Sequence, residues 1–498
     1  MRLSELINGT EPQMTSGKLA AAGALDLDIQ GVTSDSRAVR PGYLFAALPG
    51  SAADGRHFIP DAVARGAVAV LTTTEVDAPA GDGGVCVILD ANPRHRLAQI
   101  AARFFAEQPD LIVAVTGTNG KTSVTEFVRQ LWSWQGRLAA SYGTLGIITE
   151  EGEVGSGLTT PDPVELHRTL RELARNRINR VAMEASSHGL HQCRLDGVRL
   201  RAAAFTNLTQ DHLDYHQSMK AYLAAKLRLF SELLASDGAA VLNSDASHSP
   251  KIAKACRSRG IAVSSFGFTD RADLRIASVD PTPSGQCVKF IMNGRRSQVY
   301  LPLVGAFQAM NALAALALVA CVENEDPNDL LPGLGQLKGV SGRLQHVGNL
   351  DHGAAVYVDY AHTPDALRTV LSALRPHVAS RLICVFGAGG DRDSDKRAPM
   401  GAAVADGADI AIVTDDNPRT ENPAEIRQAV VNGCPFAYEI GDRQAAIHAG
   451  LDVLDAGDVL LIAGKGHESG QAVGNTIIPF DDMKVASAAI LHRGGTVR

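Results

Sequence analysis

The chain has 498 residues, of which 45% are hydrophobic and 20% are charged, a composition typical of soluble globular proteins that excludes disorder over most of its length. At roughly 150 residues per domain, this length predicts about three domains. Its 47 Lys and Arg against 54 Asp and Glu give a net charge of −7, which disfavours a nucleic-acid binder, because such proteins present basic surfaces.

The cysteines and the N-terminus indicate a reducing compartment. The seven cysteines are odd in number, scattered, and form no Cys-x-x-Cys pair, so neither a zinc site nor a disulfide framework is predicted. The first residues lack the apolar core of a signal peptide. The alanine-rich run 311–321 is too short to span a membrane and predicts a buried helix. We therefore expect a cytoplasmic protein.

The chain alternates strand and helix patterns. Residues 31–48 predict strand, loop and strand, and residues 57–73 predict a helix followed by a strand. A β-branched apolar run at 111–115 predicts a buried strand, and 122–135 predicts a helix with Gly136 at its C-cap. Further central strands are expected at 180–184 and 202–206.

A second array of strands and helices begins at about residue 340. The strands are predicted at 354–358, 382–386, 409–413 and 458–462, and the helices at about 364–375, 396–406, 423–432 and 442–454. This alternation predicts α/β domains built on parallel sheets with helices on both faces. In such sheets the loops that follow the strands gather at one edge.

The strongest local motif is TGTNGKT at 116–122, between the strand at 111–115 and the next helix. Its glycines let backbone N–H groups surround a phosphate, Lys121 supplies a positive charge, and Thr122 supplies a hydroxyl for Mg²⁺. The motif departs from G-x-x-x-x-G-K-[ST], because Val115 stands where the first glycine belongs and the glycine lies at 117. We predict a variant phosphate loop rather than a glycine-rich turn without a ligand.

Two polar segments follow the other central strands. Glu184 ends one strand, where its carboxylate could hold Mg²⁺. The alternative is a surface glutamate without a ligand. The segment FTNLTQDHLDYH at 205–216 carries Asn207, Asp211, His212, Asp214 and His216. It indicates a Mg²⁺ or phosphate site more than a Zn²⁺ site, since no third zinc ligand accompanies the two histidines. The alternative is a helix cap with solvated histidines.

Lys226 lies on an apolar stripe. In the predicted helix SMKAYLAAKLRLFSELL it is four residues from both Tyr222 and Phe230. It either snorkels to solvent or is buried, and burial would lower its pKa and leave a nucleophilic amine. Such an amine could take up CO₂ and become an anionic carbamate that binds metal.

Three strand-end loops of the last unit carry residues suited to a zwitterion. They are GAGGDRDSDKR, with Arg392, the DDNPR segment, with Asp416, Asn417, Pro418 and Arg419, and GKGHE, with Gly464, Lys465, His467 and Glu468. Arginine clamps a carboxylate and a carboxylate accepts from an ammonium group. The alternative is a set of surface salt bridges, which would not require one common edge.

These motifs together resemble the Mur ligases. TGTNGKT, EASSHGL, FTNLTQDHLDYH, YLAAKLRLF, NALAA, SGRLQ, DYAHTPD, GGDRDSDKR, DDNPRTE and GKGHE occur in the order typical of that family and span nearly the whole chain. The resemblance implies a UDP-substrate-binding domain at 1–90, an ATP-binding domain at 91–338 and a Rossmann-like amino-acid-binding domain at 339–498. It implies ATP- and Mg²⁺-dependent addition of meso-diaminopimelate to the D-Glu γ-carboxylate of UDP-MurNAc-L-Ala-D-Glu through an acyl phosphate, in peptidoglycan synthesis.

The resemblance also implies roles for individual residues. ATP would be bound by Gly117, Thr118, Asn119, Gly120, Lys121, Thr122, Ser123, Asn311, Arg343 and Asp359. The metal would be held by Thr122, Glu184, His212 and carbamylated Lys226, and Lys121, Glu184, His212 and Lys226 would be catalytic. The UDP-MurNAc-dipeptide would contact Ser34, Ser36, Asp54, Thr159, Thr160, Ser186, Gln192 and Arg194. Diaminopimelate would contact Arg392, Asp416, Asn417, Pro418, Arg419, Gly464 and Glu468.

The sequence leaves alternatives to this function. Leu158 stands where relatives can carry a polar substrate contact, and the GSAADGR loop varies in the family, so the uridine-side assignments carry less weight. A lysine-adding Mur ligase, a folylpolyglutamate synthase and a non-catalytic nucleotide-binding module are the competing interpretations. DDNPR argues against the first two, and a binding module would not need Lys226, His212 and Glu184 together. We expect a monomer acting on small molecules, without nucleic acid or membrane insertion.

Overall fold

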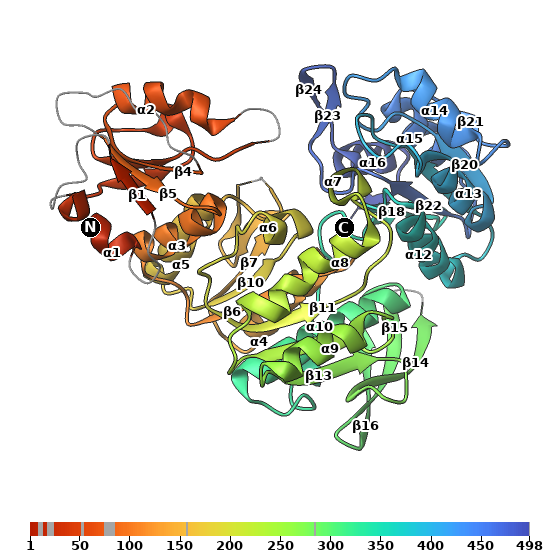
Figure 1. The fold of residues 1–498 in the computed structure, drawn as a ribbon. Coiled ribbons are helices and arrows are strands. Elements are labelled where there is room, and N and C mark those ends of the chain that lie inside the picture. Colours follow the sequence, from red (N-terminus) through yellow and green to blue (C-terminus); the bar gives the residue numbers. More distant parts are fainter. Residues whose placement is uncertain are drawn as a thin grey trace.

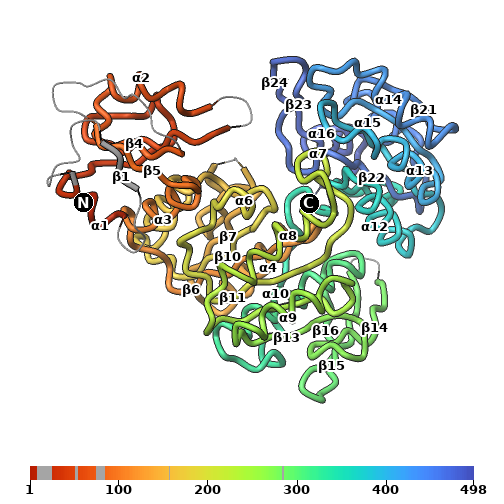
Figure 2. The backbone as a smooth tube through the Cα atoms, in the orientation of Figure 1, coloured from red at the N-terminus to blue at the C-terminus, as the bar shows by residue number. Residues whose placement is uncertain are grey.

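The computed structural model describes residues 1–7, 13–16, 24–50, 54–73, 85–155, 158–282 and 285–497. Three sheets of five, eleven and seven strands form the cores of three α/β domains in chain order. Figure 1 shows the N-terminal and C-terminal domains on opposite sides of the central domain, and the tube in Figure 2 follows the chain through them. The α/β architecture with parallel sheets is confirmed, whereas the boundaries at 90 and 338 stay predictions.

The N-terminal domain is built on a five-stranded sheet of order β1-β5-β4-β3-β2, parallel except for β1. Its strands are β1 (Gln13–Ser16), β2 (Gly31–Thr33), β3 (Tyr43–Ala46), β4 (Ala67–Thr72) and β5 (Cys86–Leu89). Its helices are α1 (Leu3–Ile7), α2 (Ile59–Ala64) and α3 (Pro93–Phe105), with short 3-10 helices at Ala24–Asp26, Ser36–Ala38 and Gly55–Phe58. The predicted strand–loop–strand and helix–strand patterns are confirmed.

The central domain carries an eleven-stranded sheet of order β16-β15-β14-β13-β12-β11-β6-β10-β7-β8-β9. Seven central strands, from β14 to β7, run parallel, and antiparallel pairs extend both ends. The strands are β6 (Leu111–Thr116), β7 (Ala139–Gly143), β8 (Gly146–Thr149), β9 (Gly152–Val154), β10 (Arg180–Glu184), β11 (Leu200–Phe205), β12 (Ala239–Asn243), β13 (Ala262–Gly267), β14 (Leu274–Thr282), β15 (Gly285–Met292) and β16 (Arg295–Leu301).

Helices cover both faces of this sheet because side chains alternate along each strand. On β6, Val113 and Val115 pack with α4 (Lys121–Trp134) and α10 (Ala306–Glu323), whereas Ile112 and Ala114 belong to the opposite core. The other central helices are α5 (Pro163–Arg175), α6 (Ser187–His191), α7 (Leu213–His216), α8 (Met219–Arg228), α9 (Ser249–Ser258) and α11 (Leu331–Leu334). α10 is long and apolar enough to cross a membrane, but it is mostly buried inside the protein, as predicted for 311–321.

The C-terminal domain has a seven-stranded sheet of order β21-β20-β19-β22-β18-β17-β25, parallel from β21 to β18. The strands are β17 (Gln345–Asn349), β18 (Ala355–Asp359), β19 (Leu382–Phe386), β20 (Ile410–Val413), β21 (Tyr438–Glu439), β22 (Val459–Ala463) and β25 (Thr496–Val497). The helices are α12 (Pro364–Leu374), α13 (Arg397–Gly407), α14 (Pro423–Val431), α15 (Arg443–Asp452) and α16 (Asp482–His492), with a 3-10 turn at Arg375–His377. All predicted strands and helices of this unit are confirmed to within two residues.

Two features differ from the sequence prediction. The helix predicted across SMKAYLAAKLRLFSELL ends as an α-helix at Arg228 and continues as a π-helix over Leu229–Leu233. A separate hairpin, β23 (Gly470–Val473) and β24 (Thr476–Pro479), follows the GKGHE loop. The π-turn is one residue wider than an α-turn, which shifts Leu233 to a half-buried position on the stripe, whereas Leu229 and Phe230 are fully buried.

Candidate active site

The phosphate loop lies between β6 and α4, as predicted. Gly117 and Gly120 have φ values of +155° and +88°. A Cβ atom on Gly117 would lie 1.9 Å from Thr206 Oγ1, and one on Gly120 would lie 2.6 Å from Asn311 Oδ1. The loop therefore needs glycine at both positions, which explains the glycine at 117.

Neighbouring groups hold the loop open toward the N-terminus of α4. Asn207 accepts the Asn119 N–H at its Oδ1 (2.8 Å) and the Thr118 N–H at its carbonyl (3.0 Å). Among the described residues, no side chain caps the N-terminus of α4. An uncapped helix N-terminus after a glycine loop favours an anion. Lys121 folds back, donating from Nζ to the carbonyls of Gly117 (3.0 Å) and Thr118 (2.8 Å).

Glu184 lies beside this loop at the end of β10. It is buried, and it accepts the Thr144 N–H at 2.8 Å and the Thr144 hydroxyl at 3.1 Å. A Cβ atom on Gly143 would lie 2.3 Å from Glu184 Oε1, so a glycine is required there. The surface-glutamate interpretation is wrong for this residue, because the carboxylate is enclosed and oriented.

Lys226 is buried, with 1% of its surface exposed, so the snorkelling interpretation is wrong. Its Nζ donates to the Gly117 carbonyl at 2.7 Å and lies 4.4 Å from the centre of the Tyr222 ring. Burial and the positive charge of Lys121 hold the Lys226 pKa well below its usual value. The lysine thus reaches the phosphate loop as a group for which the neutral amine is favoured.

His212 begins α7 with a left-handed backbone (φ +55°). Its pKa is lowered to about 4, mainly by burial. Asp211, 3.4 Å away, opposes this effect, whereas Lys121 and Lys226 add to it. A neutral imidazole is the form that binds metal.

The predicted ligands of a hard divalent cation stay a prediction. Thr122, Glu184 and a carbamate on Lys226 would supply oxygen atoms, and His212 would supply a neutral nitrogen. Within the described ranges, no three His, Cys, Asp or Glu side chains form a metal-binding group. No third zinc ligand therefore joins His212 and His216 in these ranges. The predicted Mg²⁺ ligands include Lys226 only if its amine is a carbamate.

The three residues predicted to reach the nucleotide meet near the same loop. Asn311 lies against Gly120 and donates to Gln308 Oε1 at 3.1 Å. Arg343 donates from Nη2 to Thr122 Oγ1 at 3.1 Å and stacks 4.4 Å from the Tyr360 ring. The chain after residue 340 therefore contacts the phosphate loop directly.

Asp359 ends β18 at the same interface. Its carboxylate accepts the N–H groups of Leu344 (2.5 Å) and Ala361 (2.6 Å). Burial raises the pKa of Asp359 to about 6, against the opposing effects of Arg343 and these two N–H groups. Asp359 thus holds the Leu344 backbone next to Arg343, at the carboxyl end of the C-terminal sheet.

The residues predicted to bind the dipeptide surround Glu184. The hydroxyl of Thr159 lies 2.9 Å from that of Thr144, and the Thr160 hydroxyl donates to the Glu184 carbonyl at 3.0 Å. Ser186 caps α6 by accepting the Gly189 N–H. Arg194 donates to the Thr160 carbonyl at 2.6 Å and to Gln192 Oε1 at 2.7 Å. Leu158 is exposed beside this group.

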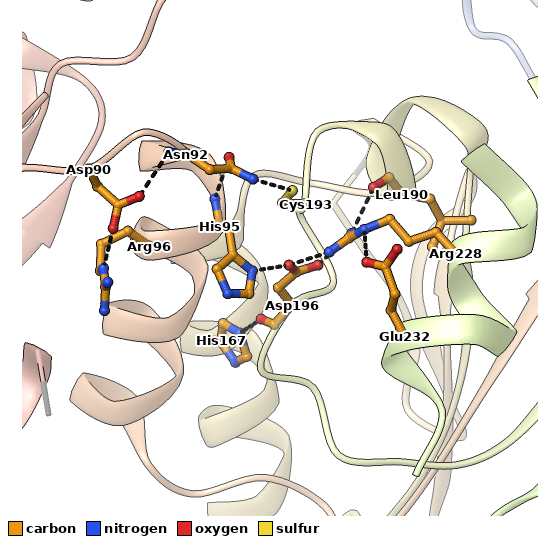
Figure 3. A network of polar contacts seen from close by, with 10 residues as sticks. All are labelled: Asp90, Asn92, His95, Arg96, His167, Leu190, Cys193, Asp196, Arg228 and Glu232. Carbon is orange, nitrogen blue, oxygen red and sulfur yellow. Dashed lines mark hydrogen bonds and ion pairs between the residues drawn. The ribbon is translucent and has the colours of Figure 1, made fainter. Parts of the chain in front are cut away.

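A buried carboxylate ties this region to α8 and α3. Figure 3 shows Asp196 between His95 and Arg228. Arg228 makes a forked pair with Asp196 at 2.7 and 2.6 Å and also donates to the Leu190 carbonyl at 2.9 Å. His95 Nδ1 lies 2.5 Å from the same carboxylate. Arg228 is two residues beyond Lys226, so the network anchors the helix that carries it.

The uridine-side residues lie in the N-terminal domain. Ser34 is exposed and Ser36 is buried in the turn after β2. The Asp54 carboxylate accepts from Arg56, whose hydrogen bonds lower the Asp54 pKa to about 2. No contact joins these three side chains to the phosphate loop among the residues that the structure places, so their role stays a prediction. Residues 51–53 of the GSAADGR loop lie outside the described residues.

The three loops predicted to form an amino-acid pocket do meet at one sheet edge. Asn417 donates from Nδ2 to Glu468 Oε2 at 2.8 Å, and Arg419 donates from Nη1 to the Gly390 carbonyl at 2.6 Å. Gly464 (φ +117°) lies against Asp416, where a Cβ atom would be 2.6 Å from Asp416 Oδ2. The interpretation as scattered surface salt bridges is wrong for these loops.

Asp416 carries the clearest sign of a ligand. It is buried, and its Oδ2 has no hydrogen-bond partner in the part of the chain that the structure describes. A buried carboxylate oxygen without a donor is costly, so it indicates a cation or an ammonium group. Pro418 is buried beside it, and Arg392 is exposed at the edge of the pocket.

The sequence named Lys465 in the GKGHE loop, whereas Arg443, Asp482 and Thr144 were not among the sequence predictions. Lys465 is fully buried and donates from Nζ to Asn417 Oδ1 and Glu468 Oε2, each at 3.0 Å. Arg443 forms a fully buried pair with Asp482 at 2.7 Å and donates to the Ala463 carbonyl. Arg443 and Thr144 stand in no motif that could have indicated them.

Family models match three parts of the chain. Residues 28–105 match the Mur ligase family catalytic domain, residues 115–319 the Mur ligase middle domain, and residues 342–466 the Mur ligase glutamate ligase domain. The UDP-N-acetylmuramoyl-L-alanyl-D-glutamate–2,6-diaminopimelate ligase of Caulobacter vibrioides is 51% identical over 469 residues, which are 92% of this chain and 95% of that protein. The ligase of the same name from Agrobacterium fabrum is 45% identical and covers 100% of both chains.

Solved structures agree with these matches. A structure of a UDP-N-acetylmuramoyl-L-alanyl-D-glutamate–2,6-diaminopimelate ligase superposes with a TM-score of 0.71 at 34% identity and covers 100% of both chains. A folylpolyglutamate synthase of Mycobacterium tuberculosis, complexed with ADP, reaches a TM-score of 0.63 at 17% identity and covers 82% of this chain and 95% of its own. At that identity the second likeness is one of fold alone.

Proposed function

This chain belongs to the Mur ligase family, and we propose that it is the ATP-dependent ligase that adds meso-2,6-diaminopimelate to the D-Glu γ-carboxylate of UDP-MurNAc-L-Ala-D-Glu in peptidoglycan synthesis. The observation that carries the proposal is the shared sheet edge. Asp359, beside the phosphate loop, accepts at its carbonyl from the Gly464 N–H at 3.1 Å. The end of β18, which holds the Leu344 backbone next to Arg343, is therefore adjacent to the start of the GKGHE loop.

The reaction uses three substrates in two steps. The D-Glu γ-carboxylate attacks the γ-phosphorus of ATP, which releases ADP and forms an acyl phosphate. A neutral amine of diaminopimelate then attacks the acyl carbon, and phosphate leaves as the amide forms. In the first step the loop from Gly117 to Ser123 and the N-terminus of α4 surround the phosphates with N–H groups. Lys121, within this loop, supplies the positive charge. To bind ATP, Lys121 must exchange its bonds to the Gly117 and Thr118 carbonyls for phosphate oxygens.

Lys226 converts from a cation to an anion in this proposal. The neutral amine attacks CO₂, a C–N bond forms and a proton leaves, so the side chain becomes a carbamate of charge −1. The lowered pKa of Lys226 supports this step by favouring the unprotonated amine. Mg²⁺ bound by the carbamate, Glu184, His212 and Thr122 would screen the phosphate charges.

The third domain selects the amino acid. Asp416 Oδ2 and Glu468 would accept from an ammonium group, and Arg419 would clamp the distal carboxylate, with Arg392, Asn417, Pro418 and Gly464 completing the pocket. Lysine lacks that carboxylate, so the half-buried Arg419 would keep its bond to the Gly390 carbonyl but gain no charged partner from the amino acid. Losing a charged hydrogen-bond partner is penalised, so diaminopimelate is preferred over lysine.

Phosphate release tests the function. We would supply ATP, Mg²⁺ and UDP-MurNAc-L-Ala-D-Glu with either meso-diaminopimelate or L-lysine in parallel. Release with diaminopimelate alone is expected. Release with lysine alone would retain the ligase but overturn the role of Arg419, and release with neither would overturn the proposed reaction. We place this activity in the cytoplasm and on a monomer, and light scattering tests the latter.

A further inference from the structure

The hairpin β23–β24 stands apart from the seven-stranded sheet of its domain. Its two strands form a sheet of their own and turn through Gly474 and Asn475. On the outer strand, Ile477 is 74% exposed, and Ile478 is exposed beside it. Figure 1 shows the hairpin at the edge of the C-terminal domain. Apolar burial therefore contributes little to holding it in place.

What fastens the hairpin is a set of hydrogen bonds to the 416–419 loop. Ala472 donates its N–H to Asn417 Oδ1 at 2.9 Å and accepts the Arg419 N–H at 3.0 Å. The Gly474 N–H donates to the Arg419 carbonyl at 2.6 Å. Arg419 thus joins β23 like one residue of a parallel strand.

Arg419 needs this support because its backbone is unusual. Its φ is +53°, a left-handed conformation that a long side chain rarely adopts. Such a conformation persists only where surrounding contacts determine it. The bonds to Ala472 and Gly474 occupy both the N–H and the carbonyl of Arg419. The hairpin therefore fixes the orientation of the Cα–Cβ bond of Arg419.

Gln471 adds a side chain of the hairpin to this set. Its Nε2 donates to the Asp416 carbonyl at 2.7 Å. The Asp416 side chain is the group with the unpartnered Oδ2. The bond to its carbonyl therefore fixes the backbone from which that side chain extends.

We propose that the β23–β24 hairpin positions the amino-acid pocket and that Gln471 is a specificity-determining positioning residue. Gln471 acts through Asp416, and its strand neighbours act through Arg419, so the ammonium acceptor and the carboxylate clamp are set at a fixed separation. Diaminopimelate carries a zwitterionic group at both ends, whereas lysine carries only an ammonium group at its distal end. The inference rests on the proposed function.

Gln471→Met tests it, because methionine keeps the length of the side chain and removes the N–H donor. We expect the KM for diaminopimelate to rise about threefold to tenfold, the ratio that one net hydrogen bond corresponds to. The KM values for ATP and UDP-MurNAc-L-Ala-D-Glu should not change. The ratio of kcat/KM for diaminopimelate to that for lysine should fall. Ile477→Thr, on the exposed strand of the same hairpin, is the matched control and should behave as wild type.

Two results would overturn the inference. One is an unchanged KM for diaminopimelate in Gln471→Met. The other is a parallel rise of all three KM values with a lower Tm, which would mark a purely structural role. Failure of the proposed function looks different, since the wild-type enzyme itself would then not use diaminopimelate.

Discussion

Replacing Asp196 by alanine should destabilise the central domain strongly. Asp196 is 0% exposed and Arg228 is 17% exposed, and two hydrogen bonds of 2.7 and 2.6 Å join them. Removing one partner of a buried ion pair costs about 3–5 kcal/mol, because the other charge stays buried. Arg228 keeps its bonds to the Leu190 carbonyl and Glu232, so the loss should lie near the lower end, about 3 kcal/mol.

Urea denaturation followed by tryptophan fluorescence measures this loss. The chain's two tryptophans, Trp132 and Trp134, both lie on α4 and report on the central domain. Asp237→Ala is the control, since Asp237 and Arg201 form an exposed pair, at 69% and 45% exposure, worth at most about 1 kcal/mol. The reasoning is refuted if the two variants lose the same free energy of unfolding.

Low pH should remove the contribution of the Asp196 carboxylate to the free energy of unfolding. Burial raises the pKa of Asp196, but hydrogen bonds from His95 and Arg228 outweigh it, and the pKa is lowered overall. A carboxyl group with a lowered folded pKa stabilises the protein above its ordinary pKa, and that contribution is lost as the pH falls through the folded value. The difference in unfolding free energy between wild type and Asp196→Ala should therefore shrink below about pH 4.

Three further outcomes are expected at the site. Lys226→Ala should be nearly inactive in phosphate-release assays. Added acetate should restore part of the activity, because a free carboxylate can replace the carbamate. Full activity of this variant without acetate would contradict the carbamate. Because the Asp359 pKa is raised to about 6, kcat/KM for ATP should fall as the pH drops through 6, when the carboxylate that holds the Leu344 backbone is protonated. The inflection should disappear in Asp359→Asn, and its persistence there would assign it to another group. Arg419→Ala should abolish most use of diaminopimelate while ATP binding measured by calorimetry is retained, and near-wild-type kinetics would exclude Arg419 as the clamp.

Features that depend on nearby residues were readable from the amino-acid sequence. The strand at 111–116 shows its apolar run, and TGTNGKT shows the glycines that the loop requires. Lys226 shows its place on an apolar stripe four residues from Tyr222, but that spacing favoured snorkelling, and only the tertiary structure shows that the side chain is buried. The parallel order of the C-terminal strands then predicted that the loops after them would share an edge, and the bonds between Asn417 and Glu468 confirm it.

Other features were decided only when distant segments packed together. β14, β15 and β16 were not predicted; β14 pairs in parallel with β13, and β15 and β16 extend the sheet from it as antiparallel strands. Asp196 looks like any loop aspartate until α3 and α8 bring His95 and Arg228 to it from residues 101 and 32 positions away. The amino-acid sequence thus determined the local geometry of each loop and the chemistry available there. Burial and long-range pairing decided which charges are desolvated, which carboxylate lacks a partner, and how Gln471 reaches Asp416 across 55 residues.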